Sequence, residues 1–309
     1  MLGTAPEGGA LAATRARGGA RLCRAGAAGG QGRVTPLLLA LGASLAWGVA
    51  DFVGPVWART WGTLRVLLWA QVGGVTAIAI AVAIRGDGPH GWRLLLAAVA
   101  AVSGMLGLYA YYHGMTTGAI SVVAPIAGVS AVIPVAFGIA TGDNPKAVQL
   151  AGAAFALAGV GLASVEHHEG TRRIAGGVGL ALLAAVGFGF YFPPMHAAGE
   201  VDFWWTSLIF RATSLAIVGA TVLTREAPLR LRRRDLVICG LVGVGDTIGN
   251  ALFAASSARG GLVSLTAVLA SLYPVVTVLL ASVVLEERVA RFQQVGIVLT
   301  LAGVVLISL

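Results

Sequence analysis

The chain has 309 residues, of which 57% are hydrophobic and 11% are charged, with a formal net charge of +8 and two cysteines. A soluble domain carries about a quarter charged residues, so this composition excludes an ordinary soluble protein and indicates a polytopic helical membrane protein. The apolar runs do not alternate with polar residues, which argues against a membrane β-barrel. The arginines cluster in an N-terminal segment and one loop, which favours anionic lipid headgroups over nucleic acid as partners.

Residues 1–33 consist mainly of glycine, alanine and arginine and contain few large apolar side chains. Such a segment cannot form a core, so we expect a disordered basic tail. It also lacks the apolar stretch of a signal peptide. The membrane-spanning part of the chain is therefore expected to begin near residue 34.

Ten apolar runs follow, and each is about long enough to cross a bilayer, because ~20 residues at ~1.5 Å rise span about 30 Å. The predicted spans are 35–57, 64–84, 92–115, 118–140, 146–165, 174–196, 204–224, 235–257, 261–284 and 290–309. The sequence thus predicts an all-α, multi-pass integral protein of the cell membrane.

The end of the chain repeats a pattern found near its middle. The segment 118–165 and the segment 261–309 each hold two apolar runs around a short polar hinge, and Leu157-Ala158-Gly159 returns as Leu301-Ala302-Gly303. Self-similarity of this kind indicates a tandem duplication.

The two predicted units cover residues 34–165 and 174–309, with five spans each. Because five is odd, the second unit crosses the membrane in the opposite orientation, as in the inverted repeats of secondary transporters. The predicted fold is therefore ten transmembrane helices in two inverted five-helix repeats. The arginines of the tail place the N-terminus inside, whereas those of 225–234 would then lie outside, so loop charge leaves the orientation open.

Three local motifs carry a resemblance to a known family: Trp47-Gly48 in the first span, Tyr273-Pro274 in the ninth, and Leu285-Glu286-Glu287-Arg288 before the tenth. With them the chain resembles, over residues 35–309, the EamA type of the drug/metabolite transporter superfamily. The resemblance implies an exporter of small metabolites, amino acids or drugs, with a central cavity between the repeats and the fifth and tenth spans at the periphery.

Two other functions remain open. A flippase for lipids or lipid-linked carriers could use the same scaffold, and the arginines of 230–234 would suit headgroups. An intramembrane enzyme would need converging catalytic or metal-binding groups. The sequence holds no nucleotide-binding or hydrolase motif, and His167-His168 with its flanking glutamates fits a solvated loop better than a metal site. We therefore expect secondary transport of a small-molecule substrate, without enzymatic activity or a cofactor, and with a proton as a possible coupling ion.

Asp51, Arg211 and Asp246 lie inside predicted spans, where an ionisable group costs about 2.5–3.5 kcal/mol. At ~1.5 Å per residue, Arg211 and Asp246 differ by only ~6 Å in depth, so they can neutralise each other, although a direct role in substrate binding is the alternative. Asp51 lies farther from the inner face of the membrane than Arg211 and Asp246 do, and Arg65 is its nearest candidate partner. If it is unpaired, Asp51 can exchange protons or bind a cationic substrate group.

Helical spacing places Trp47 and Asp51 on one face of the first span, and Asp246 and Asn250 on one face of the eighth. Such polar stripes face a cavity or another helix rather than lipid. The predicted substrate-binding residues are Trp47, Asp51, Tyr191, Arg211, Asp246, Asn250 and Tyr273. The tyrosines of Tyr109–His113, at the end of the third span, fit an aromatic belt at the membrane surface.

Overall fold

The computed structural model describes residues 8–118, 120–163, 177–225, 230–285 and 291–308, and every regular element in these ranges is helical. The first half contains α1 (Gly8–Trp61), α2 (Thr63–Arg85), η1 (Trp92–Leu95), α3 (Leu96–Thr117), α4 (Ile120–Gly128), η2 (Val129–Ala131), α5 (Val132–Thr141) and α6 (Ala147–Ala163). The second half contains α7 (Val178–Gly199), α8 (Phe203–Thr224), α9 (Arg233–Ala258), α10 (Val263–Ala270), α11 (Tyr273–Val284) and α12 (Arg291–Ser308).

Within the described ranges, 7 helical stretches are long and apolar enough to cross a membrane, and shorter apolar helices accompany them. Two of the predicted spans are interrupted. The fourth becomes α4, η2 and α5, and the ninth becomes α10 and α11. Pro274 lies in the first turn of α11, where a residue without a backbone N–H is tolerated, so a new helix can begin there.

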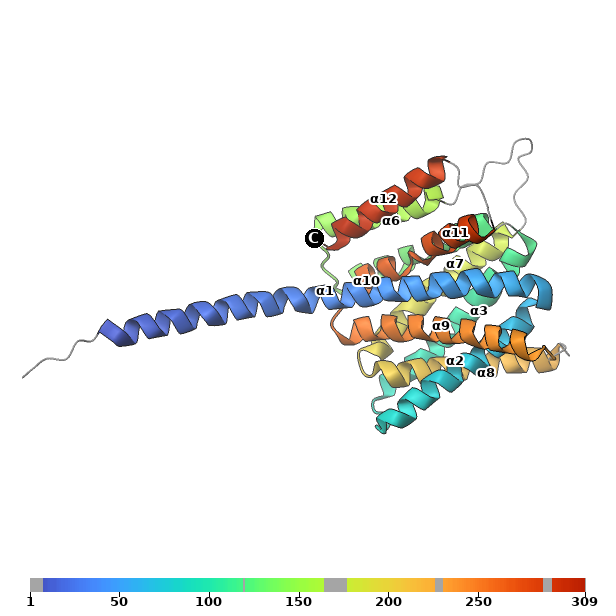
Figure 1. Cartoon of the computed structure of the whole chain (residues 1–309), viewed down its shortest axis with the longest axis horizontal. Coiled ribbons are helices and arrows are strands. Elements are labelled where there is room, and N and C mark those ends of the chain that lie inside the picture. Colours follow the sequence, from blue (N-terminus) through green and yellow to red (C-terminus); the bar gives the residue numbers. More distant parts are fainter. Residues whose placement is uncertain (1–7, 119, 164–176, 226–229, 286–290, 309) are drawn as a thin grey trace, which may run out of the picture.

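The first helix includes most of the N-terminal segment. In Figure 1, α1 continues far outside the bundle, because it begins at Gly8 rather than near residue 34. Alanine and arginine are good helix formers. A segment that extends an existing helix does not need a new nucleation step, which is the unfavourable part of helix formation.

The helices pack in pairs that join the two halves. In Figure 1, α12 lies along α6 at the edge of the bundle, and α1 lies beside α9 near its centre. The other main pairs are α3 with α7, α2 with α9 and α2 with α8. Small residues permit this close packing, since a Cβ on Gly243 of α9 would meet the backbone of Ala70 on α2.

The interrupted spans also contact each other across the halves. The α4 helix packs on α11 and α5 packs on α10, so the early part of one span faces the late part of the other. The carboxylate of Asp143, just after α5, accepts a hydrogen bond of 2.9 Å from the backbone N–H of Ser264 at the start of α10. The two spans therefore run antiparallel.

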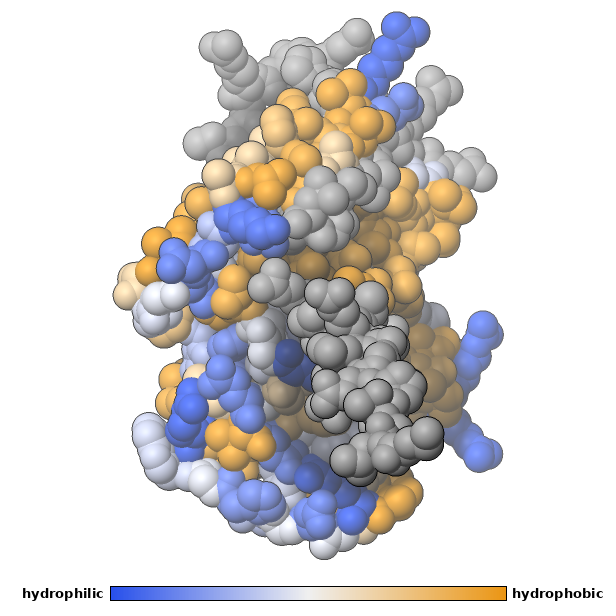
Figure 2. Space-filling view, turned by 90° about the vertical axis from the view of Figure 1, so that its left-hand side faces the viewer, coloured by the Kyte–Doolittle hydropathy of each residue, from blue (hydrophilic) through white to orange (hydrophobic). Residues whose placement is uncertain are grey.

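Ion pairs link the halves at the end of the bundle where α2 ends and α8 begins. Arg85 Nη1 donates to both carboxylate oxygens of Asp202 at 2.8 and 2.6 Å, and Arg93 Nη2 donates to Glu200 at 2.8 Å. Figure 2 looks onto this end and shows hydrophilic side chains gathered over its lower part, with hydrophobic ones on the flanks. The charged groups thus tie α2 and η1 to the α7–α8 connection.

Candidate functional site

A cavity of about 50 Å³ lies in the centre of the bundle, among α1, α3, α7, α8, α9 and α11. Its lining residues are Trp47, Asp51, Gly104, Met105, Leu108, Phe188, Tyr191, Phe192, Phe210, Asp246, Asn250 and Tyr273. Six of the seven residues predicted to bind substrate are in this set. The seventh, Arg211, does not line the cavity but forms an ion pair with Asp246. The structure therefore brings the predicted residues to one place.

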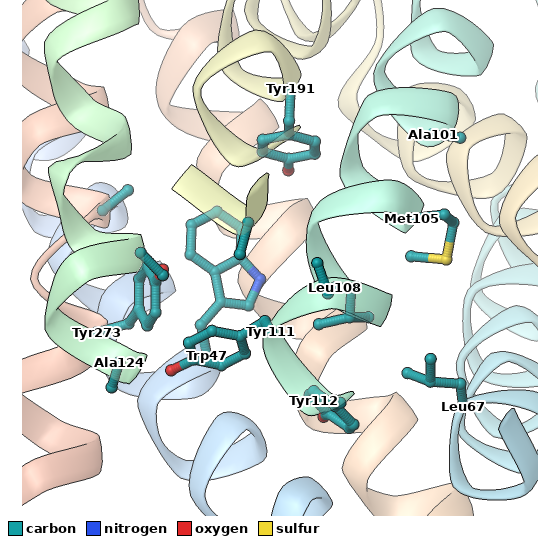
Figure 3. Close-up of a cluster of buried hydrophobic side chains, with 14 of the residues drawn as sticks. Trp47, Leu67, Ala101, Met105, Leu108, Tyr111, Tyr112, Ala124, Tyr191 and Tyr273 are labelled. Carbon is teal, nitrogen blue, oxygen red and sulfur yellow. The ribbon is translucent and has the colours of Figure 1, made fainter. Parts of the chain in front are cut away.

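Aromatic rings form most of the cavity wall. The indole of Trp47 meets the ring of Tyr191 edge to face, with centroids 6.0 Å apart, and the ring of Phe192 at 6.2 Å. Tyr273 meets Tyr111 at 6.0 Å in the same way. Figure 3 shows Trp47 between Tyr191 above and Tyr111 below, with Tyr273 beside it. These large rings keep the wall stiff, because each has few rotatable bonds.

Arg211 is fully buried and is held by two acceptors. Its Nη2 donates to Asp246 Oδ2 at 2.5 Å, and its Nη1 donates to Gln71 Oε1 at 2.8 Å. A buried charge is tolerated only when it is paired and hydrogen-bonded. The predicted pair of Arg211 and Asp246 is therefore formed, and Gln71 on α2 completes it.

The same network continues toward the cavity. Asn250 Nδ2 donates to the backbone carbonyl of Asp246 at 2.7 Å, one helical turn earlier on α9. The hydroxyl of Tyr191 donates to Asn250 Oδ1 at 2.5 Å. Asp246 and Asn250 are thereby fixed in orientation, and the chain of contacts reaches from α2 through α8 and α9 to α7.

Asp51 has different surroundings. Its side chain is 5% exposed and lines the cavity, and the carboxylate forms neither a hydrogen bond nor an ion pair with any described residue. The titratable groups around it are Asp246 on α9, Tyr111 and Tyr112 on α3, and Tyr273 on α11. It is thus a buried acid without a basic partner.

The suggested partner of Asp51, Arg65, is not in contact with it. Arg65 lies at the start of α2, in a second hollow at the end of the bundle. Asp51 is about ten residues before the end of α1, or ~15 Å along the helix axis, which is beyond the reach of an arginine at the membrane surface. The difference in depth explains why the pair does not form.

The aromatic-belt interpretation is wrong for two of its tyrosines. Tyr111 is 0% exposed and Tyr112 is 2% exposed, and both belong to the central hydrophobic core. The hydroxyl of Tyr112 lies 3.4 Å from the carbonyl of Ala50 on α1. The α3 helix is packed on several sides here, so Tyr111 and Tyr112 face protein rather than headgroups.

Sequence reasoning missed six lining residues, of which three are phenylalanines. The stretch 182–190 resembles the stretch 41–49, so Phe188 and Phe192 correspond to Trp47 and Asp51, and all four line the cavity. That alignment was therefore the signal that could have identified them. No such signal marked Gln71, because it carries no charge and has no conspicuous neighbours in sequence.

Two of the sequence features lie outside the described residues: His167-His168 and the hinge Glu286-Glu287-Arg288. Within the described ranges, no group of three or more His, Cys, Asp or Glu side chains is placed to hold a metal ion.

The model of the EamA-like transporter family matches the chain twice, over residues 34–165 and 175–309. The chain belongs to the EamA-like transporter family. It is therefore a multi-pass integral membrane transporter rather than an enzyme.

Comparisons with other proteins agree on the fold and add nothing about the substrate. A protein of known crystal structure is similar with a TM-score of 0.69 and 18% sequence identity, over 89% of this EamA-like chain and 96% of its own. Identity this low supports the fold alone. No curated protein matches the sequence.

Proposed function

We propose that this EamA-like protein is a secondary transporter that carries a small molecule bearing an amine or another organic cation through the central cavity, in exchange for a proton at Asp51. The observation that carries the proposal is the unpaired, buried carboxylate of Asp51 inside an aromatic wall. Arg211 neutralises Asp246, so the ionised cavity has one negative charge in excess. Aromatic faces and a carboxylate together suit a cationic group.

The volume of the cavity supports alternating access as the mechanism. About 50 Å³ is far below the ~300–1,000 Å³ that pockets for small ligands usually measure. A metabolite fits only if the helices around the cavity separate. The ion pairs of Arg85 with Asp202 and of Arg93 with Glu200 close one end of the bundle in this conformation.

We further propose ten membrane spans in two inverted halves, as the sequence predicts. The helix pairs support this arrangement, because exchanging the halves turns the α1–α9 contact into the α7–α3 contact and leaves the α2–α8 and α6–α12 contacts unchanged. The antiparallel contact between the interrupted spans is expected for the same symmetry. A pseudo-twofold axis would then pass near the cavity, where Trp47 and Phe188 are equivalent.

The experiment uses the full chain reconstituted into lipid vesicles with an imposed pH gradient. A panel of amino acids, primary amines and quaternary ammonium ions is offered from either side, and both substrate movement and proton flux are followed. Loading from each side separately tests the expectation of export. Fluorescent lipid analogues are included, because lipid movement without movement of any soluble cation would favour the flippase.

Asp51→Asn is the decisive variant, because it keeps the shape of the side chain and removes the charge. We expect it to lower the rate of proton-coupled transport at least tenfold. The control is Asp235→Asn, which removes a carboxylate in the first turn of α9, outside the cavity lining and away from the Arg85 and Arg93 ion pairs, and should transport at the wild-type rate. Transport by Asp51→Asn at the wild-type rate with unchanged pH dependence would refute the proposal.

A further inference from the structure

A second and larger hollow, of about 410 Å³, lies at the end of the bundle opposite the ion pairs. It is formed where α1 ends, α2 begins and α3 ends, and the proposed transport cycle assigns it no role. Its lining residues are Ala58, Arg59, Trp61, Gly62, Thr63, Leu64, Arg65, Tyr109, His113 and Thr116. No acidic side chain of the described residues contributes to this lining.

Two arginines give the hollow its charge. The Nε of Arg59 donates to the carbonyl of Met115 at 3.1 Å, which anchors its side chain across the gap from α1 to α3. The Nε of Arg65 is buried and has no hydrogen-bond partner among the described residues. The indole Nε1 of Trp61 is also buried without a partner. Buried donors are normally satisfied, so these two N–H groups are available to an acceptor that the described residues do not supply.

The first turn of α2 adds further donors to the same wall. Gly62 precedes the helix with φ of 84°, and no side chain caps the N–H groups that follow it. The first N–H groups of a helix have no intrahelical partner, and the helix dipole makes this end positive. Thr63, Leu64 and Arg65 belong both to this turn and to the lining of the hollow. Side-chain and backbone donors therefore converge on one space.

The position of the hollow indicates which anions can reach it. The candidate span of α1 ends at Trp61 and that of α2 begins at Thr63, so the hollow lies at the level of the lipid headgroups. Basic pockets between membrane helices at this level suit phosphate headgroups, because arginine offers several donors in a geometry that matches phosphate oxygens. A volume of about 410 Å³ also lies in the range of pockets for small ligands.

We propose that this hollow binds a phosphate oxyanion, with Arg59, Arg65 and the indole of Trp61 as the binding groups. The phosphate belongs either to an anionic lipid headgroup that enters from the bilayer or to a free phosphate compound that enters from the aqueous side. Both sources present the same oxygens to the same donors. The site is separate from the central cavity, so it can be tested without knowing the transported substrate.

The test measures binding to the purified full chain in detergent, by native mass spectrometry and by the shift in unfolding temperature. The probes are short-chain phosphatidylglycerol, phosphatidylcholine of the same chain length, and inorganic phosphate. The main variant is the double substitution Arg59→Gln and Arg65→Gln. Arg225→Gln is the matched control, because Arg225 is exposed at the same end of the bundle and does not line the hollow.

We expect wild type and Arg225→Gln to bind phosphatidylglycerol alike, and the double variant to bind it at least tenfold more weakly. If inorganic phosphate also binds and shows the same loss, the site accepts free phosphate compounds. If only phosphatidylglycerol shows the loss, the ligand is a lipid headgroup. Equal affinity of the double variant and wild type for both anionic probes, or equal wild-type affinity for phosphatidylcholine and phosphatidylglycerol, would overturn the proposal.

A further variant guards against loss of folding. Trp61→Phe keeps an aromatic ring and removes only the unpartnered N–H, so it should fold even if the double variant does not. We expect a loss of phosphatidylglycerol affinity of about threefold. If the double variant does not fold, an affinity of Trp61→Phe for phosphatidylglycerol equal to that of wild type would count against the site.

Discussion

The two sides of the central cavity each carry a carboxylate inside the bundle, and their surroundings are opposite. Asp246, on the side of α8 and α9, accepts from Arg211 and is further fixed by Asn250. Asp51, on the side of α1, meets aromatic rings and forms no ion pair with a described residue. A paired acid contributes to the folded structure, whereas an unpaired one is stable only when it is protonated or bound to a ligand. The same residue type therefore serves the scaffold on one side and is available for transport on the other.

The largest expected effect comes from breaking the pair on the α8–α9 side. Arg211→Ala and Asp246→Ala should each lower the free energy of unfolding by about 3–5 kcal/mol, because each leaves a buried charge unpaired. The double variant should lose less than the sum of the two single variants. Thermal unfolding in detergent measures all three.

The outcome of this cycle separates a pair from two independent residues. Strictly additive losses would show that Arg211 and Asp246 do not depend on each other. Arg211 retains Gln71 as a second acceptor, so Asp246→Ala is expected to be the milder of the two single variants.

A smaller effect is expected on the Asp51 side. Asp51→Asn should change the free energy of unfolding by no more than about 1 kcal/mol, because no hydrogen bond or ion pair is lost and the volume is kept. The comparison would fail if Asp51→Asn destabilised the protein as strongly as Asp246→Ala. Thermal unfolding under the same conditions as for the pair makes the two sides directly comparable.

The smallest effect is expected at the closed end of the bundle. Asp202→Asn removes the negative charge that binds Arg85 but keeps an oxygen that accepts from the backbone N–H of Trp204, so the start of α8 stays capped. Arg85 is partly exposed, and we expect a loss of about 1 kcal/mol or less.

The same substitution should also favour opening at this end, because it weakens one of the two ion pairs that join the halves there. Ala254 is buried near this end of α9. The cysteine of Ala254→Cys should react faster with a water-soluble thiol reagent in the Asp202→Asn variant than in the protein that retains Asp202. Equal labelling rates would indicate that the Arg85–Asp202 ion pair does not hold this end closed.

The sequence by itself determined the all-helical membrane class and six of the twelve residues that line the cavity. Long apolar runs can satisfy their backbone groups in a bilayer only as helices, and helical spacing states which residues share a face. That reasoning placed Trp47 with Asp51, and Asp246 with Asn250, before any contact was known. Depth along the helix then paired Arg211 with Asp246, as the structure shows.

Only the tertiary structure decided which neighbours each face meets. Depth and angle locate a residue on its own helix, but the helix beside it depends on how the whole bundle packs. For this reason Arg65 was considered as a partner of Asp51, and Tyr111 and Tyr112 were assigned to the membrane surface. The role of Gln71 could not be predicted for the same reason, because this uncharged side chain matters only as the acceptor of a hydrogen bond from the buried Arg211 on another helix. Contacts between helices are long-range in sequence, and no local pattern encodes them.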